Sequence, residues 1–222
     1  AHAREALAKL EHLVVQDIFL TETAFHADVV LPASAHAEKW GTFTNTNRQV
    51  QMARPVVNPP GEARQDWELI QHIARGVGLN WNYQHPSEVF DEMASCMPSL
   101  KNITWERVDR ENSVTYPVDS PDVPGNEIIF GDKFPTKSGR ARIVPADVSP
   151  PAELPDADYP FVLTTGRMLE HWHTGAMTRR AEVLDLLEPG PTASLNPATL
   201  GRYGVYPGQM VRVTTRRGSI EL

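Results

Sequence analysis

The sequence has little of three things: cysteine, positive charge and long apolar runs. Cys96 is the only cysteine among the 222 residues, which excludes an internal disulfide and any metal or iron–sulfur site built from cysteines of this chain. A reducing compartment is compatible with this cysteine content. No apolar run approaches the roughly 18 to 20 residues that cross a bilayer, and the first residues do not have the composition of a signal peptide.

Negative charge exceeds positive charge, and the formal net charge is −7. This balance argues against a surface for nucleic acid or anionic membranes, since binding driven by counterion release needs a basic surface. An anionic ligand must therefore be bound by donors gathered at one place in the chain. Hydrophobic residues make up 41% of the sequence, which is enough for a real core in one large domain or two small ones.

The first third of the chain predicts α/β structure. A helix is expected near 4–11, a strand at 13–15 and a second strand at 28–31, which Pro32 ends. This order is typical of a parallel sheet, whose ligands gather beyond the carboxyl ends of the strands. The sequence begins inside the expected helix and ends along an expected strand, so we interpret the chain as a piece of a longer polypeptide, truncated at both ends.

Two groups of polar residues in this part could bind a ligand. Asp17 and Thr21 lie just past the end of the first expected strand, but they could equally cap the turn and the short segment that follow. Residues 41–51 gather small hydroxyls and amides around Arg48 and could wrap a ligand. The alternative, which composition favours, is an extended segment with Phe43 inward and threonines outward.

Two helices are predicted to be structural. The first runs from Asp66, its N-cap, to about Val77, and the second begins at Ser87 and stops at Pro98. One face of each helix is expected in the core, with Trp67, Ile70, Ile73, Ala74 and Val77 in the first and Val89, Phe90, Met93 and Met97 in the second. Cys96 lies on the second helix without a basic residue close in sequence to activate it, and is expected to be a buried, inert thiol.

Residues 112–158 are rich in proline and have little apolar periodicity. We interpret them as a connector between two bodies, with a turn at 137–140. A buried strand is predicted at 161–163 and a helix near 181–187.

The last part of the chain carries clear local signals. Asn196 and Pro197 are typical of the cap and the first residue of a helix, and Gly204 is typical of its end. Residues 211–214 are predicted to pair with 219–221 around a turn. Strands with very short helices indicate a β-barrel-type domain.

Residues 163–180 are the most informative stretch. They place hydroxyls, two glycines, two histidines and three arginines directly after the expected strand. Residues 164–167 suit a pyrophosphate, because glycine lets the backbone approach while hydroxyls and an arginine supply donors. His171 and His173 could instead form a metal pair, but no third ligand is in register. A third interpretation is that these histidines and Trp172 only pack at the rim of a barrel.

The segment 165–180 closely resembles the pterin-binding signature of the bis(molybdopterin guanine dinucleotide) oxidoreductases, the family that contains formate dehydrogenases and periplasmic nitrate reductases. The pattern Gly-Arg-x-x-Glu-His-Trp-His-Thr-Gly-x-Met-Thr-Arg-Arg is long and specific. Residues 16–32 and 38–51 resemble two further segments of that family, in the expected order. Residues 196–218 are similar to its C-terminal double-psi barrel.

The resemblance implies a fold. We expect a Rossmann-like α/β segment, of the type of domains 1–3 in formate dehydrogenase and DMSO reductase, followed by a double-psi β-barrel. The implied domains are part of the α/β molybdopterin oxidoreductase domain at 1–111, a connector at 112–158, and the start of the dinucleotide-binding barrel at 159–222. The sequence most resembles the C-terminal part of the catalytic α subunit of cytoplasmic, NAD-dependent molybdenum or tungsten formate dehydrogenases.

The resemblance also implies the residues that bind the bis(molybdopterin guanine dinucleotide), here bis-MGD. Asp17 and Thr21 would contact one guanine nucleotide, and residues 165–174 would line the pyrophosphate and dithiolene side of the other pterin. The implied set is Asp17, Thr21, Asn45, Arg48, Thr165, Gly166, Arg167, Met168, Glu170, His171, Trp172, His173 and Thr174.

These residues are not expected to contribute equally. Arg167, His171 and His173 would be the strongest donors to the cofactor. Asn45 and Arg48 are weaker candidates, because their block could simply support the site. No residue of this chain is expected to ligate the metal, which the pterin sulfurs would hold.

Other parts of the family's machinery are missing from this sequence. The cysteine cluster for a [4Fe–4S] centre is absent, and Cys96 does not replace the metal-ligating cysteine or selenocysteine, because Met97 and Pro98 follow it in place of a histidine and an arginine. The catalytic residues are therefore expected upstream, and the fragment alone is expected to be inactive. The implied partners are the remainder of the catalytic subunit, iron–sulfur and flavin subunits that reduce NAD, and formate, without nucleic acid or membrane.

The reaction implied for the parent enzyme is the reversible oxidation of formate to carbon dioxide, with electrons passed through iron–sulfur centres to NAD. Two alternatives stay open. A nitrate reductase shares the signature, and large subunits of respiratory NADH dehydrogenases keep this fold as a cofactor-free scaffold. The hydrogen-bonding groups at 167–174 favour cofactor binding over the scaffold.

Overall fold

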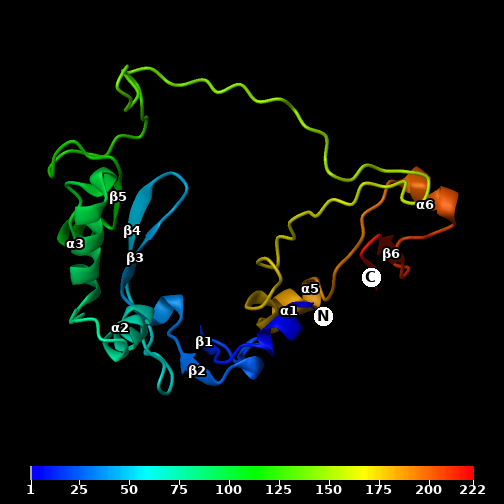
Figure 1. Cartoon of the computed structure of the whole chain (residues 1–222), viewed down its shortest axis with the longest axis horizontal. Helices are drawn as coiled ribbons and strands as arrows, with labels where there is room; N and C mark the ends of the chain where they lie inside the picture. The colour runs from blue at the N-terminus through cyan, green and yellow to red at the C-terminus, as the bar shows by residue number, and fades with distance from the viewer. Residues whose placement is uncertain (1) are drawn as a thin grey trace. The chain divides into compact units, whose positions relative to one another are not determined.

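The computed structural model describes residues 2–222, and the chain divides into two compact units, Ala1–Ile143 and Val144–Leu222 (Figure 1). Helices and two small sheets build the first unit, whereas short helices and one hairpin build the second. In the described part of the chain, no helix is both long enough and apolar enough to cross a membrane.

The first unit begins with a short helix and a parallel pair of strands. α1 spans His2–Leu7, β1 spans Val14–Asp17 and β2 spans Val29–Pro32, and the two strands pair in parallel. Both predicted strands and the α/β character are thus confirmed, although α1 ends before the predicted residue 11. A parallel bridge between Ala33 and Arg64 adds a third extended piece beside β2.

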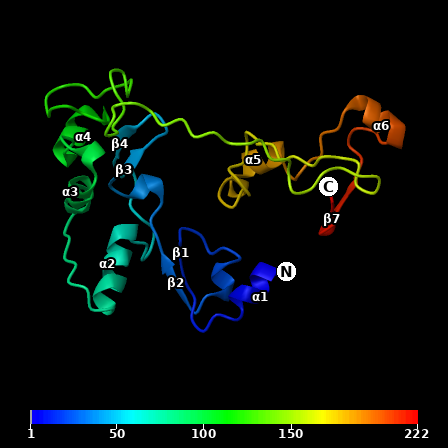
Figure 2. The ribbon, with the colours of Figure 1, turned by 45° about the horizontal axis from the view of Figure 1, so that its top comes forward.

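An antiparallel sheet of three strands follows. β3 (Gly41–Thr44), β4 (Gln49–Ala53) and β5 (Ser113–Thr115) pair in the order β3-β4-β5. Residues 41–51 are therefore extended, as composition favoured, and they fold back on themselves as a hairpin. The tip of this hairpin points away from β1 and β2 in each view of the ribbon (Figures 1 and 2).

The prediction that Phe43 faces the core is wrong. Val50 is buried and pairs with Thr44, so the alternation of side chains along a strand places Phe43 on the other face of the sheet. The Phe43 side chain is exposed and packs against His36, with ring centroids 4.3 Å apart.

Three helices lie along one side of the β3–β4 hairpin (Figure 2). α2 spans Asp66–Gly76, α3 spans Pro86–Cys96 and α4 spans Trp105–Glu111. The predicted positions of α2 and α3 are confirmed. The N-cap of α2 is Gln65 rather than Asp66, because Asp66 lies in the first turn and its carboxylate binds side chains of other segments. Short 3-10 turns occur at Ala24–His26, His36–Glu38, Pro98–Leu100 and Thr178–Arg180.

The apolar face predicted for α2 is largely wrong. The helix buries Leu69, Gln71 and Ala74, whereas Ile70, Ile73 and Val77 are exposed. A polar residue can be buried here because the Gln71 amide bonds the main chain of Tyr83 twice: its Nε2 donates to the carbonyl at 3.0 Å, and its Oε1 accepts from the N–H at 2.6 Å.

The face predicted for α3 is correct only at its centre. Phe90 is buried, but Met93 and Met97 are exposed. Cys96 is exposed as well, so the prediction of a buried thiol is wrong. α3 packs against the core through Phe90 and Ala94, which are one helical turn apart, and leaves Met93, Cys96 and Met97 exposed.

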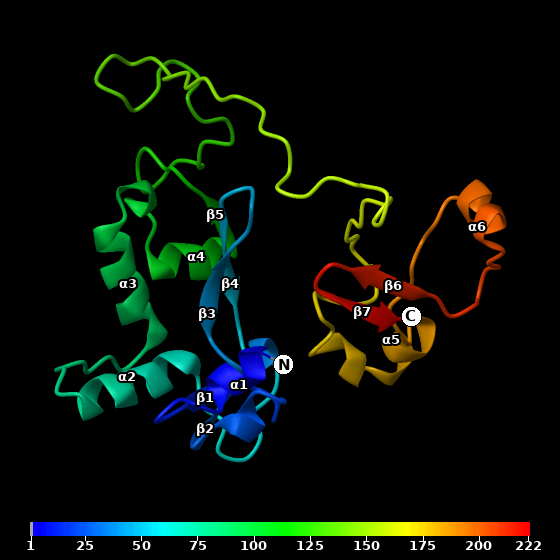
Figure 3. The same ribbon diagram turned by 45° about the vertical axis from the view of Figure 1, so that its right-hand side comes forward.

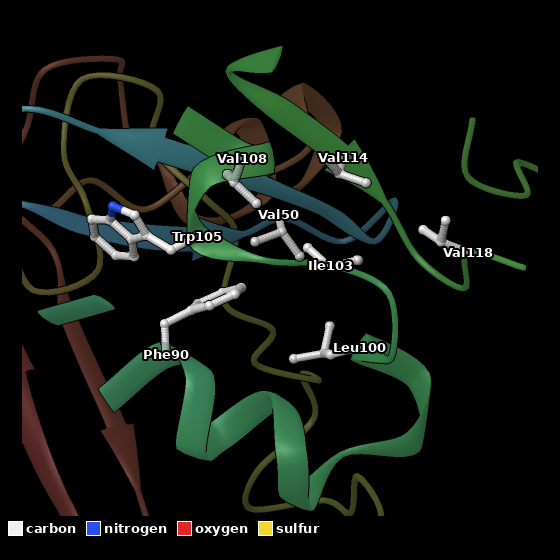
Figure 4. Close-up of a cluster of buried hydrophobic side chains, with 8 residues drawn as sticks. All are labelled: Val50, Phe90, Leu100, Ile103, Trp105, Val108, Val114 and Val118. Carbon is white, nitrogen blue, oxygen red and sulfur yellow. The ribbon is translucent and has the colours of Figure 1, made fainter. Parts of the chain in front are cut away.

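The core of the first unit lies between α3, α4 and the antiparallel sheet. Figure 4 shows its side chains converging from these elements and from the segment after β5. Its members are Val50, Phe90, Leu100, Ile103, Trp105, Val108, Val114 and Val118. Because Val114 and Val118 belong to it, the beginning of the predicted connector packs with the first unit. Among the described residues, no apolar side chain after Val118 is buried.

The second unit contains two short helices and a hairpin (Figure 3). α5 spans Glu182–Leu187, α6 spans Pro197–Tyr203, β6 spans Arg212–Thr215 and β7 spans Gly218–Glu221. The predicted helices and the antiparallel hairpin are confirmed.

The caps of α6 are also confirmed. The Asn196 side chain accepts a hydrogen bond from the N–H of Ala198 at 2.9 Å, and Gly204 ends the helix in the left-handed conformation with φ 64°.

Two expectations for the second unit do not hold in the described residues. No strand forms at 161–163, and Phe161, Val162 and Leu163 are exposed. A strand needs a neighbour for its backbone groups, and β6 and β7 pair only with each other. A closed barrel is therefore not formed by the described residues.

Candidate functional site

The segment 164–170 is an irregular, mostly exposed stretch in the second unit. Thr165, Gly166 and Arg167 are exposed, and a β-carbon added at Gly166 would meet nothing within 4 Å. No hydrogen bond or ion pair involves the Arg167 guanidinium within the described part of the chain. Met168 and Glu170 are partly buried. The segment thus offers hydroxyls, open backbone and an unused arginine, which are donors suited to phosphate oxygens.

A tight turn follows this segment, and His171 is its centre. His171 is buried, its Nε2 lies 2.8 Å from the main-chain oxygen of Glu188, and its Nδ1 lies 3.2 Å from Thr178 Oγ1. A carbonyl oxygen only accepts, so Nε2 carries a proton. Thr178 Oγ1 also accepts from the N–H of Trp172 at 3.1 Å. Both ring nitrogens of His171 therefore have partners inside the chain.

Trp172 and His173 stand at the outside of this turn. Both are exposed, and their rings meet edge to face with centroids 4.7 Å apart. His173 has a left-handed backbone with φ 53°, which is uncommon for a residue with a side chain. Thr174 is exposed beside it. Of the two histidines predicted to bind ligand, His173 is the one whose ring nitrogens are accessible.

Gly175 lets the turn close on the side chain of Arg179. It has φ 75°, and a β-carbon there would come within 2.5 Å of Arg179 Cγ. Arg179 is in turn fixed by the main-chain oxygen of Pro189 at 2.5 Å and by the carboxylate of Asp185 at 3.0 Å. Of the three arginines in the predicted motif, Arg179 is used for structure and Arg167 is left open.

Asp17 and Thr21 lie at the carboxyl end of β1, as predicted. Asp17 Oδ1 accepts a hydrogen bond from the N–H of Phe19 at 3.2 Å, and Thr21 Oγ1 accepts from the N–H of Ala24 at 3.4 Å. The capping roles that the sequence left open are thus observed. Each side chain keeps further hydrogen-bonding capacity, because a carboxylate has a second oxygen and a hydroxyl has its own proton.

Asn45 and Arg48 lie at the tip of the β3–β4 hairpin. Asn45 Oδ1 accepts from the N–H of Gln49 at 3.0 Å, which closes the turn. The Arg48 guanidinium donates to the main-chain oxygens of Tyr116, of Asn126 at 3.1 Å and of Glu127 at 2.6 Å. Arg48 therefore fastens residues 116–127 to the hairpin.

A buried arginine, Arg107, has no counterpart in the sequence prediction. Arg107 on α4 is 5% exposed, and it donates to the main-chain oxygen of Val123 at 2.6 Å and bonds Glu111 at 3.2 Å. An arginine in a helical pattern is ordinarily read as surface, so only the three-dimensional structure identifies it.

In the described part of the chain, neither metal-ligating side chains nor cavities indicate a second site. Within the described residues, no group of three or more histidine, cysteine, aspartate or glutamate side chains could hold a metal ion. Two cavities of about 410 and 330 Å³ lie in the first unit, beside α2 and beside β5. Their linings include none of the predicted site residues.

Comparison with known proteins decides the family. The family described as Molybdopterin oxidoreductase matches residues 1–75, and the domain described as Molydopterin dinucleotide binding domain matches residues 161–222. The chain belongs to the molybdopterin oxidoreductase family. The second match contains the whole of segment 165–174 and the turn around His171.

Curated relatives are similar over nearly the whole chain. The α subunit of the F420-dependent formate dehydrogenase of Methanocaldococcus jannaschii is 46% identical over 221 residues, covering 99% of this chain and 33% of that protein. The α subunit of F420-dependent formate dehydrogenase 2 of Methanococcus maripaludis is 40% identical, with 99% and 32% covered. The chain thus spans about a third of the length of these relatives.

A solved structure shares the fold. Acetylene hydratase from Pelobacter acetylenicus superposes with a TM-score of 0.68 at 23% identity, over 99% of this chain and 32% of that one. At this identity the likeness concerns the fold alone, and it agrees with the mixed α/β architecture of the family.

Proposed function

We propose that this chain is part of the catalytic subunit of a formate dehydrogenase and that it binds bis-MGD. One observation supports the proposal most directly. The match to the dinucleotide-binding domain contains the segment around Arg167, whose exposed hydrogen-bond donors are available to a ligand. The similarity to α subunits of formate dehydrogenases supports the choice of substrate.

The donor set fits a pyrophosphate. Arg167 would pair with a phosphate through its planar fork, Thr165 would donate its hydroxyl, and Gly166 leaves the backbone open to close approach. His173 and Trp172 would add a ring donor and an aromatic face. His171 would act indirectly, by holding the turn through its two internal hydrogen bonds.

In the first unit, Asp17 and Thr21 would contact a guanine nucleotide. A carboxylate can accept from the amino and ring N–H groups of guanine, and the remaining oxygen of Asp17 is suited to this. We assign Asn45 and Arg48 to support, because their side chains bind the chain itself. The double-psi barrel would begin near residue 159 and would be completed by residues beyond the β6–β7 hairpin.

The chemistry is divided between cofactor and protein. When bound, the pterin sulfurs would hold molybdenum or tungsten, which accepts the two electrons that formate gives up as it becomes carbon dioxide and a proton. This chain would bind and orient the cofactor, and iron–sulfur centres elsewhere in the enzyme would carry the electrons onward. The acceptor would be NAD or the F420 of the similar enzymes.

The test uses the complete subunit that contains these residues. Purified protein should contain guanine nucleotide and either molybdenum or tungsten, and it should reduce NAD or F420 with formate. Protein that lacks pterin and both metals would overturn cofactor binding and favour a scaffold. Cofactor-loaded protein that reduces nitrate and leaves formate unchanged would overturn the substrate.

One substitution tests the position of the site. Arg167→Ala should lower the metal and guanine content of the purified subunit by on the order of tenfold or more, since a charge-assisted bond to phosphate is lost. Arg142→Ala, which removes another exposed arginine, should leave both contents unchanged. Equal contents in the two variants would show that Arg167 does not hold the cofactor.

A further inference from the structure

Three segments that are distant in sequence meet at the side chain of Asp66. Gln16 in β1 donates from its Nε2 to Asp66 Oδ1 at 2.8 Å. Lys39, just before β3, forms an ion pair with Asp66 Oδ2. Asp66 itself is the first residue of α2. One carboxylate thus joins the end of β1, the approach to β3 and the start of α2, and we call these three side chains the Asp66 brace.

The backbone around the brace is joined at the same place. The main-chain N–H of Ser34 donates to the oxygen of Arg64 at 2.8 Å, and the N–H of Ala33 donates to the oxygen of Asp17 at 3.0 Å. The N–H of Trp40 donates to Gln65 Oε1 at 3.2 Å. These bonds connect the carboxyl ends of β1 and β2 to the residues that enter α2.

The ion pair in the brace is less exposed, and therefore less screened by water and salt, than a surface pair. The Lys39 side chain is 23% exposed and that of Asp66 is 42% exposed, whereas the Arg4–Glu22 pair of the same unit is 70% and 85% exposed. Burial alone raises the pKa of Asp66, but the hydrogen bonds from Lys39 and Gln16 lower it more, so its pKa is below the ordinary value. Asp66 is therefore a carboxylate at neutral pH.

Gln16 is the residue directly before Asp17, which we assign to the guanine nucleotide. A strand residue alternates in direction with its neighbour, so the brace holds the backbone of β1 from one side while Asp17 extends from the other. We propose that the Asp66 brace is a positioning device: it fixes the carboxyl end of β1 and thereby sets how firmly Asp17 and Thr21 hold the nucleotide. This inference rests on the proposed function.

The experiment measures how fast the complete, cofactor-loaded subunit releases guanine nucleotide into an ultrafiltrate. Asp66→Asn keeps the shape and the acceptor for Gln16 but removes the charge that Lys39 needs. Asp109→Asn is the control, because Asp109 forms an ion pair with Arg54 at 2.6 Å in the same unit, with side chains 46% and 38% exposed. Thermal stability of each variant is measured in parallel.

Asp66→Asn should release nucleotide on the order of tenfold faster, whereas Asp109→Asn should lower stability to a similar degree without faster release. Lys39→Met should match Asp66→Asn, and Lys39→Arg should restore slow release because it keeps the charge. In an Asp17→Ala background, Asp66→Asn should speed release less than it does in the wild type, since the brace acts in part through Asp17. If the charge variants do not fold, Gln16→Met replaces them in the same release measurement, because it removes a single hydrogen bond of the brace and should also speed release.

The outcomes separate the two proposals. A subunit that contains no guanine nucleotide at all overturns the proposed function. A loaded subunit in which Asp66→Asn and Asp109→Asn release nucleotide equally overturns the brace alone. Additive effects of Asp17→Ala and Asp66→Asn would also overturn it, because they would show that Asp66 acts on the fold in general.

Discussion

Gly125 lies directly against the main-chain carbonyl of Thr115. A β-carbon on residue 125 would be 1.5 Å from that oxygen and 2.5 Å from its carbon. Because these are backbone atoms of β5, they cannot rotate away as a side chain could. We expect Gly125→Ala to destabilise the first unit by about 3 kcal/mol or more, at the upper end of overpacking costs. Thermal or denaturant unfolding of the complete subunit measures this change.

Gly131→Ala is the control for this prediction. A β-carbon at Gly131 would meet nothing within 4 Å, so we expect no more than about 0.5 kcal/mol of change. If the two variants unfold at the same denaturant concentration, the close approach of residue 125 to β5 is contradicted.

Arg48 and Arg167 should respond oppositely to substitution. Arg48→Ala removes a guanidinium that donates to carbonyls of residues 116, 126 and 127, and should cost roughly 2 kcal/mol of stability, the range for hydrogen bonds from a charged group. The protein that does fold should keep its metal content. Arg167→Ala should show normal stability and reduced metal content. Metal loss in folded Arg48→Ala protein would show instead that Arg48 contributes to cofactor binding.

Thr178 links His171 to Trp172 through one hydroxyl. Thr178→Val keeps the shape but removes the partner of His171 Nδ1 and of the Trp172 N–H, at about 1 kcal/mol for each bond. The ring nitrogen shifts of His171 in NMR spectra should move, and amide exchange of residue 172 should quicken. Thr192→Val, at an exposed position, should change neither. Unchanged His171 signals in Thr178→Val would contradict the assigned bond.

The segment before residue 160 should loosen in acid. A hydrogen bond from Arg217 lowers the pKa of Glu153 below its ordinary 4.5, and a backbone bond from Tyr159, with Arg216 nearby, lowers that of Asp156 below 3.8. For a carboxylate whose folded pKa is lowered, the stabilisation is complete above the ordinary pKa and is lost as pH falls through the lowered value.

Hydrogen exchange of residues 153–159 between pH 6 and pH 3 tests this expectation. Protection should be constant down to about pH 4.5 and should fall below it. Glu153→Gln should already be less protected at pH 6 and should show a weaker pH dependence. A pH-independent wild type would show that these ion pairs contribute nothing to the order of the segment.

Local signals in the sequence were reliable where the cause was itself local. The Asn196 cap, the Gly204 stop and the β6–β7 hairpin depend on residues that are neighbours in the chain, and all three are confirmed. The parallel pairing of β1 and β2 followed from the order of elements. The long motif at 165–180 gave the family because its residue types are specific as a set.

Packing and long-range polar contacts could not be predicted in this way. Periodicity identified an apolar stripe on α2, but the helix packs on another side because Gln71 binds the turn at Tyr83. The strand predicted at 161–163 lacks a neighbour among the described residues. The Lys39–Asp66 pair joins residues that are 27 positions apart in the sequence, so no local sequence pattern predicts it. At the site, the residue types identified candidate hydrogen-bonding groups, but they could not show that both ring nitrogens of His171 already have partners in the chain.

The two units differ in what holds them together, and this has a practical consequence. Every buried apolar side chain that the structure describes lies at or before Val118, whereas the second unit carries largely exposed ion pairs such as Arg216–Asp156, Arg217–Glu153 and Arg212–Glu221. Dissolved salt screens exposed charges over about 10 Å at 0.1 M but leaves apolar burial intact. Concentrated salt should therefore make the second unit more sensitive to proteases while the first unit stays resistant.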